Sequence, residues 1–360
     1  MRRIFSKWTA VGLVVLAAAI MSAVATASKA ASVQVCVLLP DTKSSVRWQD
    51  FDAPDFAKAL KAAGVTYLIT NALNDPAKQK AQAQACLQAG AKVVIETALD
   101  AGSAAAIEKL FTSSGGKAID YDRQVAGGTA SVYVSFDGKQ VGVLQAQGVL
   151  SGLKGKTKPV VAELWGGKTD ANAFLFKSGN DAVLNPLFAK GTIKKGPQQF
   201  VPGWLATNAA PIFSQMLVST NNKIDGSIAA NDNIAGAVVA TLQARHLKPI
   251  ALSGQDATAQ GVQNIISGWQ TMTVFKFVPL EAAAAAKAAV QLLKGQKLTG
   301  VNAYCNATKN ACSPKAGGGS EPSVLIPPTA ITKANYTILF KQKFLKKSDV
   351  CVGKFKQYCK

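Results

Sequence analysis

Histidine is almost absent from this sequence: His246 is the only one among 360 residues. No two cysteines have the C-x-x-C spacing of a zinc site, and no G-x-S-x-G, H-E-x-x-H or His–Ser–Asp set occurs. Histidine is the commonest general acid or base in enzymes and a frequent metal ligand. We therefore expect no catalytic residues, no metal and no cofactor, and the sequence offers no positive support for an enzyme.

Arginine is scarce as well, although the sequence is rich in positive charge. Only five of the 40 basic residues are arginines, and two of these, Arg2 and Arg3, lie near the N-terminus. Arg47 and Arg123 each stand in a loop-like segment just after an apolar run. Since lysine already supplies generic charge, arginine at these two places indicates a need for a rigid, planar fork of donors. Such a fork grips oxygen atoms of a carboxylate, a phosphate or a pair of sugar hydroxyls.

Long hydrophobic runs are lacking too, apart from one near the N-terminus. Basic residues precede an apolar run over 11–20, and small residues at 25–27 or 28–30 offer a cleavage site. This run is shorter than the roughly 20 residues of a membrane span, and no cysteine at the cleavage region could carry a lipid anchor. The pattern predicts a signal peptide over residues 1–30. After its cleavage we expect a soluble protein that is periplasmic or secreted.

The net charge is +20, and removing residues 1–27 leaves 37 basic against 20 acidic residues, or +17. The lysines are scattered along the chain, which favours a solvated surface over a nucleic-acid interface, so we expect no nucleic-acid partner. The six cysteines fit an oxidising compartment, but their pairing cannot be read from the sequence. Pairs that could form are Cys305 with Cys312, Cys351 with Cys359, and Cys36 with Cys86.

From residue 33 to about 295, short β-branched runs alternate with longer, Ala-rich helical stretches. Five runs form a first series and five a second: 33–39, 65–70, 92–96, 117–120 and 131–135, then 159–165, 198–201, 224–230, 249–254 and 271–275. Asp75-Pro76 is typical of a helix start, with an N-cap followed by proline. The alternation predicts an α/β fold with two similar parallel sheets. The roughly 330 residues that follow the predicted signal peptide are more than a single hydrophobic core usually stabilises, so two domains are expected.

Polar planar groups and tryptophans follow nearly every predicted strand. In parallel sheets, ligands bind beyond the carboxyl ends of the strands. Sugar hydroxyls both donate and accept hydrogen bonds, and the apolar faces of a sugar ring pack on indoles. Buried Arg47 and Arg123 would need carboxylates, and Asp256 and Asp122 are the expected partners. The candidate ligand-binding residues are Arg47, Trp48, Arg123, Asp170, Asn172, Trp204, Asn231, Asp256 and Lys276.

The polar residues and tryptophans after the predicted strands also have a purely structural interpretation. An Asp or Asn at a strand end is an N-cap or turn former about as often as a ligand contact, and this remains the alternative for Asp122 and Asp232. Trp165 and Trp269 are better explained by packing. The Gly-Gly-Lys at 166–168 lacks the spacing of a phosphate-binding loop.

Three long segments resemble a known family: residues 118–147, 220–237 and 251–276. With the short motifs RWQ (47–49), YDR (121–123), GW (203–204) and AND (230–232), they are similar to xylose-binding members of the type I, ribose-binding-like periplasmic sugar-binding proteins of bacterial ABC importers. The resemblance runs from about 33 to 296 and returns weakly at 323–336. Residues 302–320 depart from it as an enlarged loop, and Ala171 replaces an expected polar residue.

The resemblance implies a type I periplasmic-binding-protein fold, with two Rossmann-like lobes joined by a three-segment hinge near 136–138, 274–277 and 325–328. The N-terminal lobe would comprise 31–137 plus 277–325, the C-terminal lobe 138–276 plus 326–345, and 346–360 would form a basic, Cys-containing tail. It places sugar contacts on the candidate residues, with Trp48 and Trp204 as stacking partners and Asp170 as a further polar position.

The implied function is the capture of a monosaccharide, D-xylose in the first place, and its delivery by a monomeric binding protein to an ABC permease in the membrane. Two alternatives stay open. One is a sugar sensor that docks to a chemoreceptor or sensor kinase, and the other is a different sugar, such as glucose or ribose.

Overall fold

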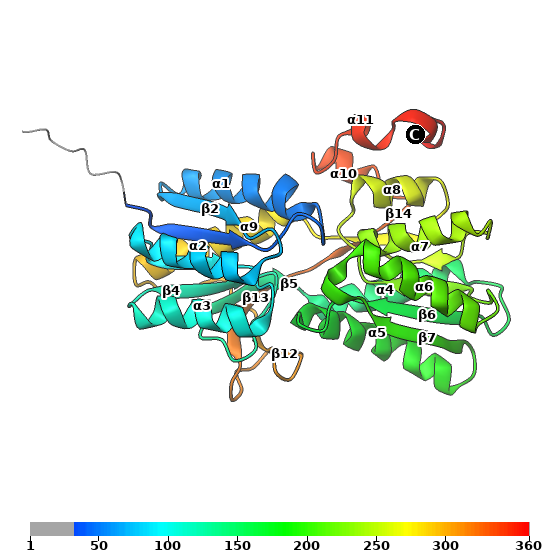
Figure 1. The fold of residues 1–360 in the computed structure, drawn as a ribbon, viewed down its shortest axis with the longest axis horizontal. Coiled ribbons are helices and arrows are strands. Elements are labelled where there is room, and N and C mark those ends of the chain that lie inside the picture. Colours follow the sequence, from blue (N-terminus) through cyan, green and yellow to red (C-terminus); the bar gives the residue numbers. More distant parts are fainter. Residues whose placement is uncertain (1–31, 360) are drawn as a thin grey trace, which may run out of the picture. The chain divides into compact units, whose positions relative to one another are not determined.

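A computed structural model describes residues 32–359 of the chain. The predicted signal peptide, residues 1–30, lies outside the described residues. These residues form two α/β units, each with helices on both faces of a mainly parallel sheet, as in a Rossmann-like lobe (Figure 1). Over the described part of the chain, no helix has the length and apolar character needed to cross a membrane.

The first sheet has eight strands in the order β12-β11-β13-β5-β4-β3-β1-β2. The pairings among β1 to β5 and between β5 and β13 are parallel, whereas β11 runs antiparallel to both β12 and β13. The strands are β1 (Val35–Leu39), β2 (Tyr67–Asn71), β3 (Val93–Glu96), β4 (Lys117–Tyr121), β5 (Val132–Phe136), β11 (Ala303–Asn306), β12 (Ala311–Ser313) and β13 (Glu321–Ile326).

Helices cover both faces of this sheet, which explains why its inner strands are continuous apolar runs. Val35 and Val37 of β1 pack with α1 and α9, while Cys36 and Leu38 face α2 and α3. The helices are α1 (Ala53–Ala62), α2 (Pro76–Gln88), α3 (Ala101–Ser113) and α9 (Val278–Leu293), and a π-helical turn (Trp48–Asp52) precedes α1. Asp75 caps α2 as predicted, because its carboxylate accepts hydrogen bonds from the N–H groups of Ala77 and Lys78.

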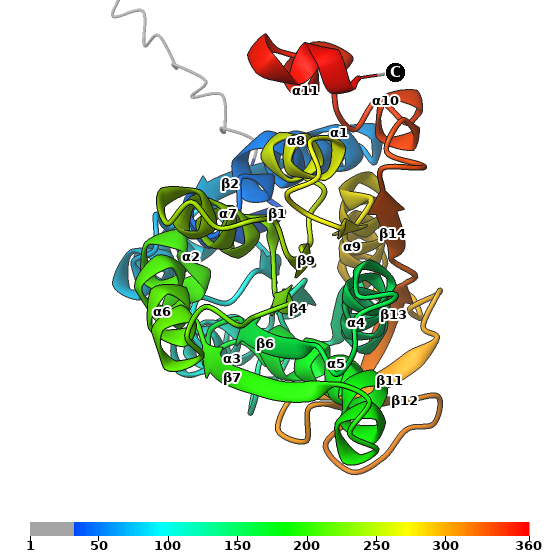
Figure 2. The ribbon, with the colours of Figure 1, turned by 90° about the vertical axis from the view of Figure 1, so that its right-hand side faces the viewer.

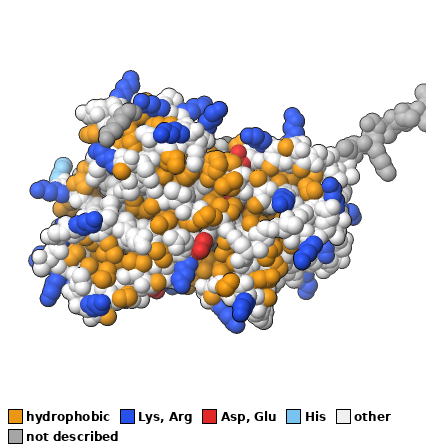
Figure 3. Space-filling model, turned by 180° about the vertical axis from the view of Figure 1, so that it is seen from behind, with side chains coloured by type: hydrophobic (Ala, Val, Ile, Leu, Met, Phe, Trp, Pro, Cys, Tyr) orange, Lys and Arg blue, Asp and Glu red, His pale blue; other side chains and the backbone are white. Residues whose placement is uncertain are grey.

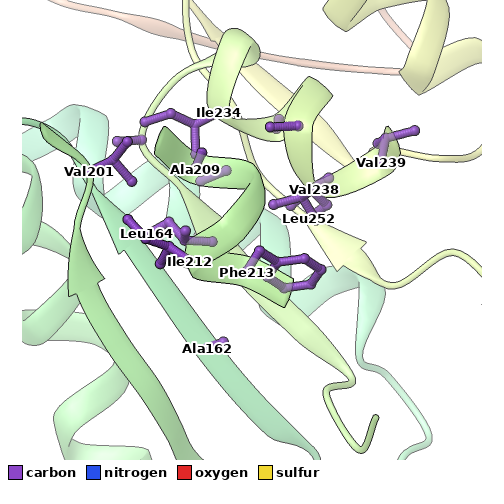
Figure 4. Packing of buried hydrophobic residues seen from close by; sticks show 14 of the residues in the cluster. Ala162, Leu164, Val201, Ala209, Ile212, Phe213, Ile234, Val238, Val239 and Leu252 are labelled. Carbon is purple, nitrogen blue, oxygen red and sulfur yellow. The ribbon is translucent and has the colours of Figure 1, made fainter. Parts of the chain in front are cut away.

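The second sheet has four parallel strands in the order β7-β6-β8-β9. Helices α4 and α5 lie on one side of it and α6 and α7 on the other (Figure 2). Figure 4 shows the core on the α6–α7 side, where Phe213 and Val238 pack near Leu164 and Leu252. The elements are β6 (Val160–Trp165), β7 (Lys194–Phe200), β8 (Gly226–Ala229), β9 (Ala251–Leu252), α4 (Gly138–Gly152), α5 (Ala171–Ala189), α6 (Ala206–Ser219), α7 (Asp232–Ala244) and α8 (Ala259–Ile266).

The chain passes between the two units three times, close to the predicted positions. It leaves β5 at Phe136 and enters α4 at Gly138. It returns from β10 (Met272–Phe275) to α9, and it leaves again between β13 and β14 (Thr329–Thr332), which pairs antiparallel with β10. The fold is therefore the type I arrangement of two lobes joined by three connections.

The last predicted run forms β10, which pairs with β14 and also lies parallel beside the end of β9, through the Gln255–Val274 bridge and a hydrogen bond from Val274 N–H to the carbonyl oxygen of Gly254. One detail of the sequence-based prediction is wrong. Residues 302–320 are not only an enlarged loop, since β11 and β12 extend the first sheet as an antiparallel pair with Cys305 directly opposite Cys312. This region lacks the strand–helix alternation on which the prediction rested, so its strands could not be recognised.

The C-terminal segment covers α8 with two short helices, α10 (Ile338–Lys341) and α11 (Lys347–Val350), and a 3-10 turn. Its Phe344 stacks on Phe51, with ring centroids 4.3 Å apart, and also meets Phe275 edge-on. Lysine side chains are spread over the face of the molecule seen in Figure 3 rather than gathered in one patch. This distribution agrees with a solvated lysine surface.

All six cysteines form disulfides, and the pairs are those considered from the sequence: Cys36–Cys86, Cys305–Cys312 and Cys351–Cys359. The first joins β1 to α2 and is fully buried. Its partners are 50 residues apart, against 7 for Cys305–Cys312. Because a cross-link restricts the unfolded chain more when it closes a longer loop, the first should contribute most to stability.

We predict that replacing both Cys36 and Cys86 with alanine lowers the free energy of unfolding by about 1.5 kcal/mol more than the same change at Cys305 and Cys312. Urea unfolding of the two double variants, compared with the oxidised parent protein, measures this difference. Equal losses would show that loop length does not govern the contribution of these disulfides.

Candidate functional site

All nine candidate residues line one cavity at the carboxyl ends of the strands. Five further residues complete its wall: Ser44, Ser45, Asp122, Phe176 and Gln255. The free volume of this cavity is about 20 Å³, room for about one water molecule. The cavity is thus almost filled by its own side chains, most of them polar.

A larger groove of about 1070 Å³ lies between α1 and the C-terminal segment. Its lining is mostly apolar, and none of the candidate residues belongs to it. The convergence of buried charged, amide and indole groups makes the small cavity the better candidate for a specific ligand site.

The nine candidate residues lie in the segments that directly follow seven strands. Arg47 and Trp48 follow β1, Arg123 follows β4, and Lys276 follows β10. Asp170 and Asn172 follow β6, Trp204 follows β7, Asn231 follows β8, and Asp256 follows β9. Residues far apart in the sequence meet because the carboxyl ends of parallel strands lie at one edge of each sheet.

The guanidinium of Arg47 is buried among three carboxylates. Nε and Nη2 donate to Asp52 at 2.9 and 2.7 Å, Nη2 also donates to Glu281 at 2.6 Å, and Nη1 donates to Asp122 at 2.7 Å. Four of its five N–H groups are therefore committed to the protein. Burial opposes the charge, but these three carboxylates outweigh it and raise the pKa of Arg47 well above its ordinary value.

Asp122 is the shared partner of two cations. Its Oδ2 accepts from Arg47 and, at 2.9 Å, from Nζ of Lys276. Burial alone would raise the pKa of Asp122, but Lys276 and Arg47 outweigh burial and hold it well below the ordinary value. Burial and the charge of Asp122 raise the pKa of Glu281 to about 8, despite Arg47.

Arg123 is less committed than Arg47. Nη1 donates to the carbonyl oxygen of Ala98 at 2.9 Å, and Nε lies 3.0 Å from Asp170. Within residues 32–359, no protein acceptor is found for Nη2. The expected pairings of the two arginines are therefore wrong: Arg47 contacts Asp122 rather than Asp256, and Arg123 contacts Asp170 rather than Asp122. Asp122 itself has a left-handed backbone (φ 60°).

Two indoles form part of the wall. The guanidinium of Arg47 lies over the Trp48 ring, with its central carbon 4.4 Å from the ring centroid, and the guanidinium carbon of Arg123 lies 5.3 Å from the same centroid. Trp204 rests against Gly166, where any Cβ would overlap its ring. Its Nε1 is buried and has no hydrogen-bond partner among the described residues.

Several lining residues also hold the loops in place. Asn231 caps α7 by accepting from Ile234 N–H, and its Nδ2 donates to the carbonyl oxygen of Ser44 at 3.0 Å. Asp256 has φ 94° and accepts from the Ser45 hydroxyl at 2.8 Å. The capping role and the place in the cavity wall therefore occur together at Asn231, and they are not alternatives.

Asp122 and Asp232, for which a purely structural role was the alternative, occupy different positions relative to the cavity. Asp122 lines the cavity and belongs to its charge network. Asp232 does not line it but is fully buried behind it, accepting from Thr258 and Gln270. Burial and the charge of Asp256 raise the pKa of Asp232 to about 7, although its hydrogen bonds oppose this.

Five wall residues were not among the nine candidates. Asp122 and Gln255 adjoin candidates in the same loops, so position alone could have included them. Ser44 and Ser45 precede Arg47 in the same way. Phe176, in contrast, lies inside α5, one turn beyond Asn172, and only the four-residue helical spacing could have pointed to it.

The fold and the cavity together define a two-lobed ligand-binding protein of the type I class. The sequence matches the profile of the periplasmic binding protein domain over residues 35–297. The chain belongs to this family.

Relatives of known function cover nearly the whole chain. The D-xylose-binding periplasmic protein of Escherichia coli is 31% identical over 90% of this chain and 94% of its own length. The protein of the same name from Haemophilus influenzae is 31% identical over 80% of this chain and 83% of its own. Among solved structures, a carbohydrate transporter solute-binding protein from Chloroflexus aurantiacus, in complex with D-glucose, has a TM-score of 0.78 and 28% identity and covers 88% of this chain and 98% of its own.

We predict that Arg47→Lys destabilises the protein, because one ammonium cannot replace four directed N–H contacts to three buried carboxylates. The free energy of unfolding should fall by about 2 kcal/mol. Arg245→Lys is the matched control, since Arg245 is exposed and should change stability by less than about 0.5 kcal/mol. Urea unfolding curves measure both, and equal midpoints for the two variants would contradict the structural role of Arg47.

Proposed function

We propose that the protein is an extracytoplasmic solute-binding protein that captures a monosaccharide, D-xylose in the first place, and delivers it to the permease of an ABC transporter. The observation that carries this proposal is unused hydrogen-bonding capacity in the cavity wall. Nε1 of Trp204 and Oε1 of Gln255 are buried there without a partner. Buried polar atoms are normally paired, so a donor without an acceptor points to a ligand hydroxyl.

The charge balance of the wall favours a neutral ligand. Arg47, Arg123 and Lys276 each lie within ion-pair distance of at least one carboxylate. No cation is left over to attract a phosphate or a carboxylate. A neutral polyol fits better, since its hydroxyls can bond to both the cations and the carboxylates of such pairs.

The roles of the residues follow from their free atoms. Nη2 of Arg123 can donate two hydrogen bonds to adjacent hydroxyls, whereas Arg47 retains one N–H and chiefly holds Asp122 in place. Asp256 and Asn231 can accept from and donate to the opposite edge of the ring. Trp48 and Trp204 offer indole surfaces for its apolar faces.

A monosaccharide is larger than the cavity, so binding requires the two units to separate and close again. We propose residues 31–137 plus 277–325 and residues 138–276 plus 326–345 as the two moving lobes, with 346–360 as a tail, and the three connections as the hinge. Contacts that such opening breaks include Ser45–Asp256, Asn231–Ser44 and Asn233–Lys43.

D-xylose is preferred because two relatives at 31% identity carry that name. The D-glucose complex of a structural neighbour at 28% identity makes glucose the main competitor. The sugars differ by one hydroxymethyl group, so the shape of the wall decides between them. The names of these relatives also support a periplasmic location and a role in transport.

We expect titration calorimetry to detect binding of one sugar from the panel D-xylose, D-glucose, D-ribose, L-arabinose and D-galactose. Affinity near micromolar, about −8 kcal/mol, is reasonable for one small ligand with many hydrogen bonds. Tighter binding of glucose than of xylose would change the assigned sugar. The absence of heat with every sugar would refute the proposal.

Arg123→Lys should weaken binding of that sugar at least tenfold, about 1.4 kcal/mol, because a lysine cannot donate two parallel hydrogen bonds. Arg245→Lys carries the same change outside the cavity and should bind like the parent protein. Thermal unfolding of both variants checks that the fold is kept. If Arg123→Lys binds normally, the planar fork has no part in recognition.

A further inference from the structure

The segment after β4 carries Asp122 and Arg123 into the cavity, and carboxyl groups on its far side hold it. The N–H of Val125 donates to Oδ2 of Asp120 at 2.6 Å. Nε2 of Gln124 donates to Oε2 of Glu321 at 2.9 Å and to the carbonyl oxygen of Cys305, also at 2.9 Å. Residues 122–125 are therefore held by hydrogen bonds to Asp120 of β4 and to residues of β11 and β13.

These carboxyls belong to a buried group that has no cation. Glu96, Glu108 and Asp120 are at most 1% exposed, and Glu321 is partly buried. Glu96 lies directly opposite Asp120 in the pairing of β3 with β4, and the charges of Glu108 and Glu321 act on Asp120. None of the ion pairs within residues 32–359 involves any of the four.

The charged groups that face Glu321 come from several elements and are nearly all acidic. They are Asp120 on β4 and Glu108 on α3, with Glu96 on β3 and Asp100 at the start of α3 behind them. The neighbouring cation is Arg123, which turns instead to Ala98 and Asp170.

Buried carboxyls that lie close together without a cation keep their protons more readily, because burial and mutual repulsion both disfavour the charged form. Burial and the charge of Glu108 raise the pKa of Glu321 from 4.5 to about 8, although hydrogen bonds from Gln124 and Asp120 oppose this. Burial and the charges of Glu321 and Glu108 raise the pKa of Asp120 well above its ordinary value.

We propose that Glu321, in its protonated form, is a positioning residue for Asp122 and Arg123, acting through Gln124 and Asp120. When Glu321 releases its proton to solvent, repulsion from the acidic group drives its partly buried side chain outward. Gln124 is then pulled with it, and the segment that orients Arg123 loses one of its anchors. Sugar affinity should therefore fall as the pH rises. This inference rests on the proposed sugar-binding function.

The raised pKa of Glu321 also makes the stability of the folded protein depend on pH. Below 4.5, Glu321 is protonated in both the folded and the unfolded chain. Between 4.5 and about 8 the unfolded chain has lost this proton while the folded protein keeps it, so stability falls over this range and levels off above it. Glu321→Gln keeps the hydrogen-bonding pattern of the protonated acid and removes this dependence.

The test compares the pH profiles of sugar affinity for the parent protein and Glu321→Gln, by calorimetry with D-xylose, or with the tightest-binding sugar of the panel, from pH 6 to 9. Asp232 and Glu281 titrate in both proteins, so the difference isolates Glu321. We expect the parent protein to lose at least threefold more affinity than the variant. Glu163→Gln is the matched control, because Glu163 is a buried glutamate with a raised pKa in the second sheet, and its profile should follow the parent.

Superimposable profiles for the parent and Glu321→Gln would overturn the inference, as would a Glu163→Gln profile that matches Glu321→Gln. Melting temperatures from pH 5 to 9 provide a readout that needs no sugar, and they should fall less in Glu321→Gln than in the parent. If no sugar binds at any pH, the proposed function fails, whereas equal slopes of melting temperature refute the proton-holding group itself.

A second variant tests the link to the cavity, and it also serves if Glu321→Gln does not fold. Gln124→Ala leaves all four carboxyls in place but removes the hydrogen bond to Glu321. Its melting temperature should keep the pH dependence of the parent protein, while its sugar affinity at pH 6 should drop at least threefold. Normal affinity at pH 6 would show that Glu321 does not act through Gln124.

Discussion

The buried guanidinium of Arg47 is the interaction on which the cavity depends. It joins three carboxylates from separate parts of the chain: Asp52 at the start of α1, Asp122 after β4, and Glu281 in the first turn of α9. Removing any one of them would leave an incompletely paired charge out of water, which is costly. Asp122 also binds Lys276, which stands where the chain crosses from β10 to α9. One ion-pair network therefore connects the wall of the cavity with a connection between the units.

The two arginines, which look alike in the sequence, have different hydrogen-bonding roles. Arg47 donates nearly all its N–H groups to protein carboxylates and so fixes the position of the Asp122 side chain. Arg123 keeps one end of its guanidinium free, and we propose that the acidic group behind its loop helps to hold it in place. Arg47 supports the cavity wall, whereas recognition of the sugar is the role that we propose for Arg123. Exposed lysines carry most of the net charge and take no part in this arrangement.

Much of the fold and all nine candidate wall residues could be predicted from the sequence. Short, β-branched apolar runs marked ten strands, because strands buried on both faces read as continuous apolar runs. Polar residues directly after those runs marked the cavity, because strand ends of a parallel sheet converge. The β11–β12 pair escaped prediction, since an antiparallel hairpin added to a sheet edge follows no strand–helix alternation. Phe176 was missed because it reaches the cavity from within a helix.

The sequence by itself determined the α/β class, the order of the strands along the chain, and which short segments carry polar groups to their ends. Only the tertiary structure decided how those groups pair. Asp122 pairs with Arg47, which is 75 residues away, rather than with its neighbour Arg123. Likewise, the charges of Glu108 and Glu321 act on Asp120 only because α3, β4 and β13 come together in the fold. Local patterns follow from nearest neighbours in the chain, whereas charge partners depend on distances that only packing sets.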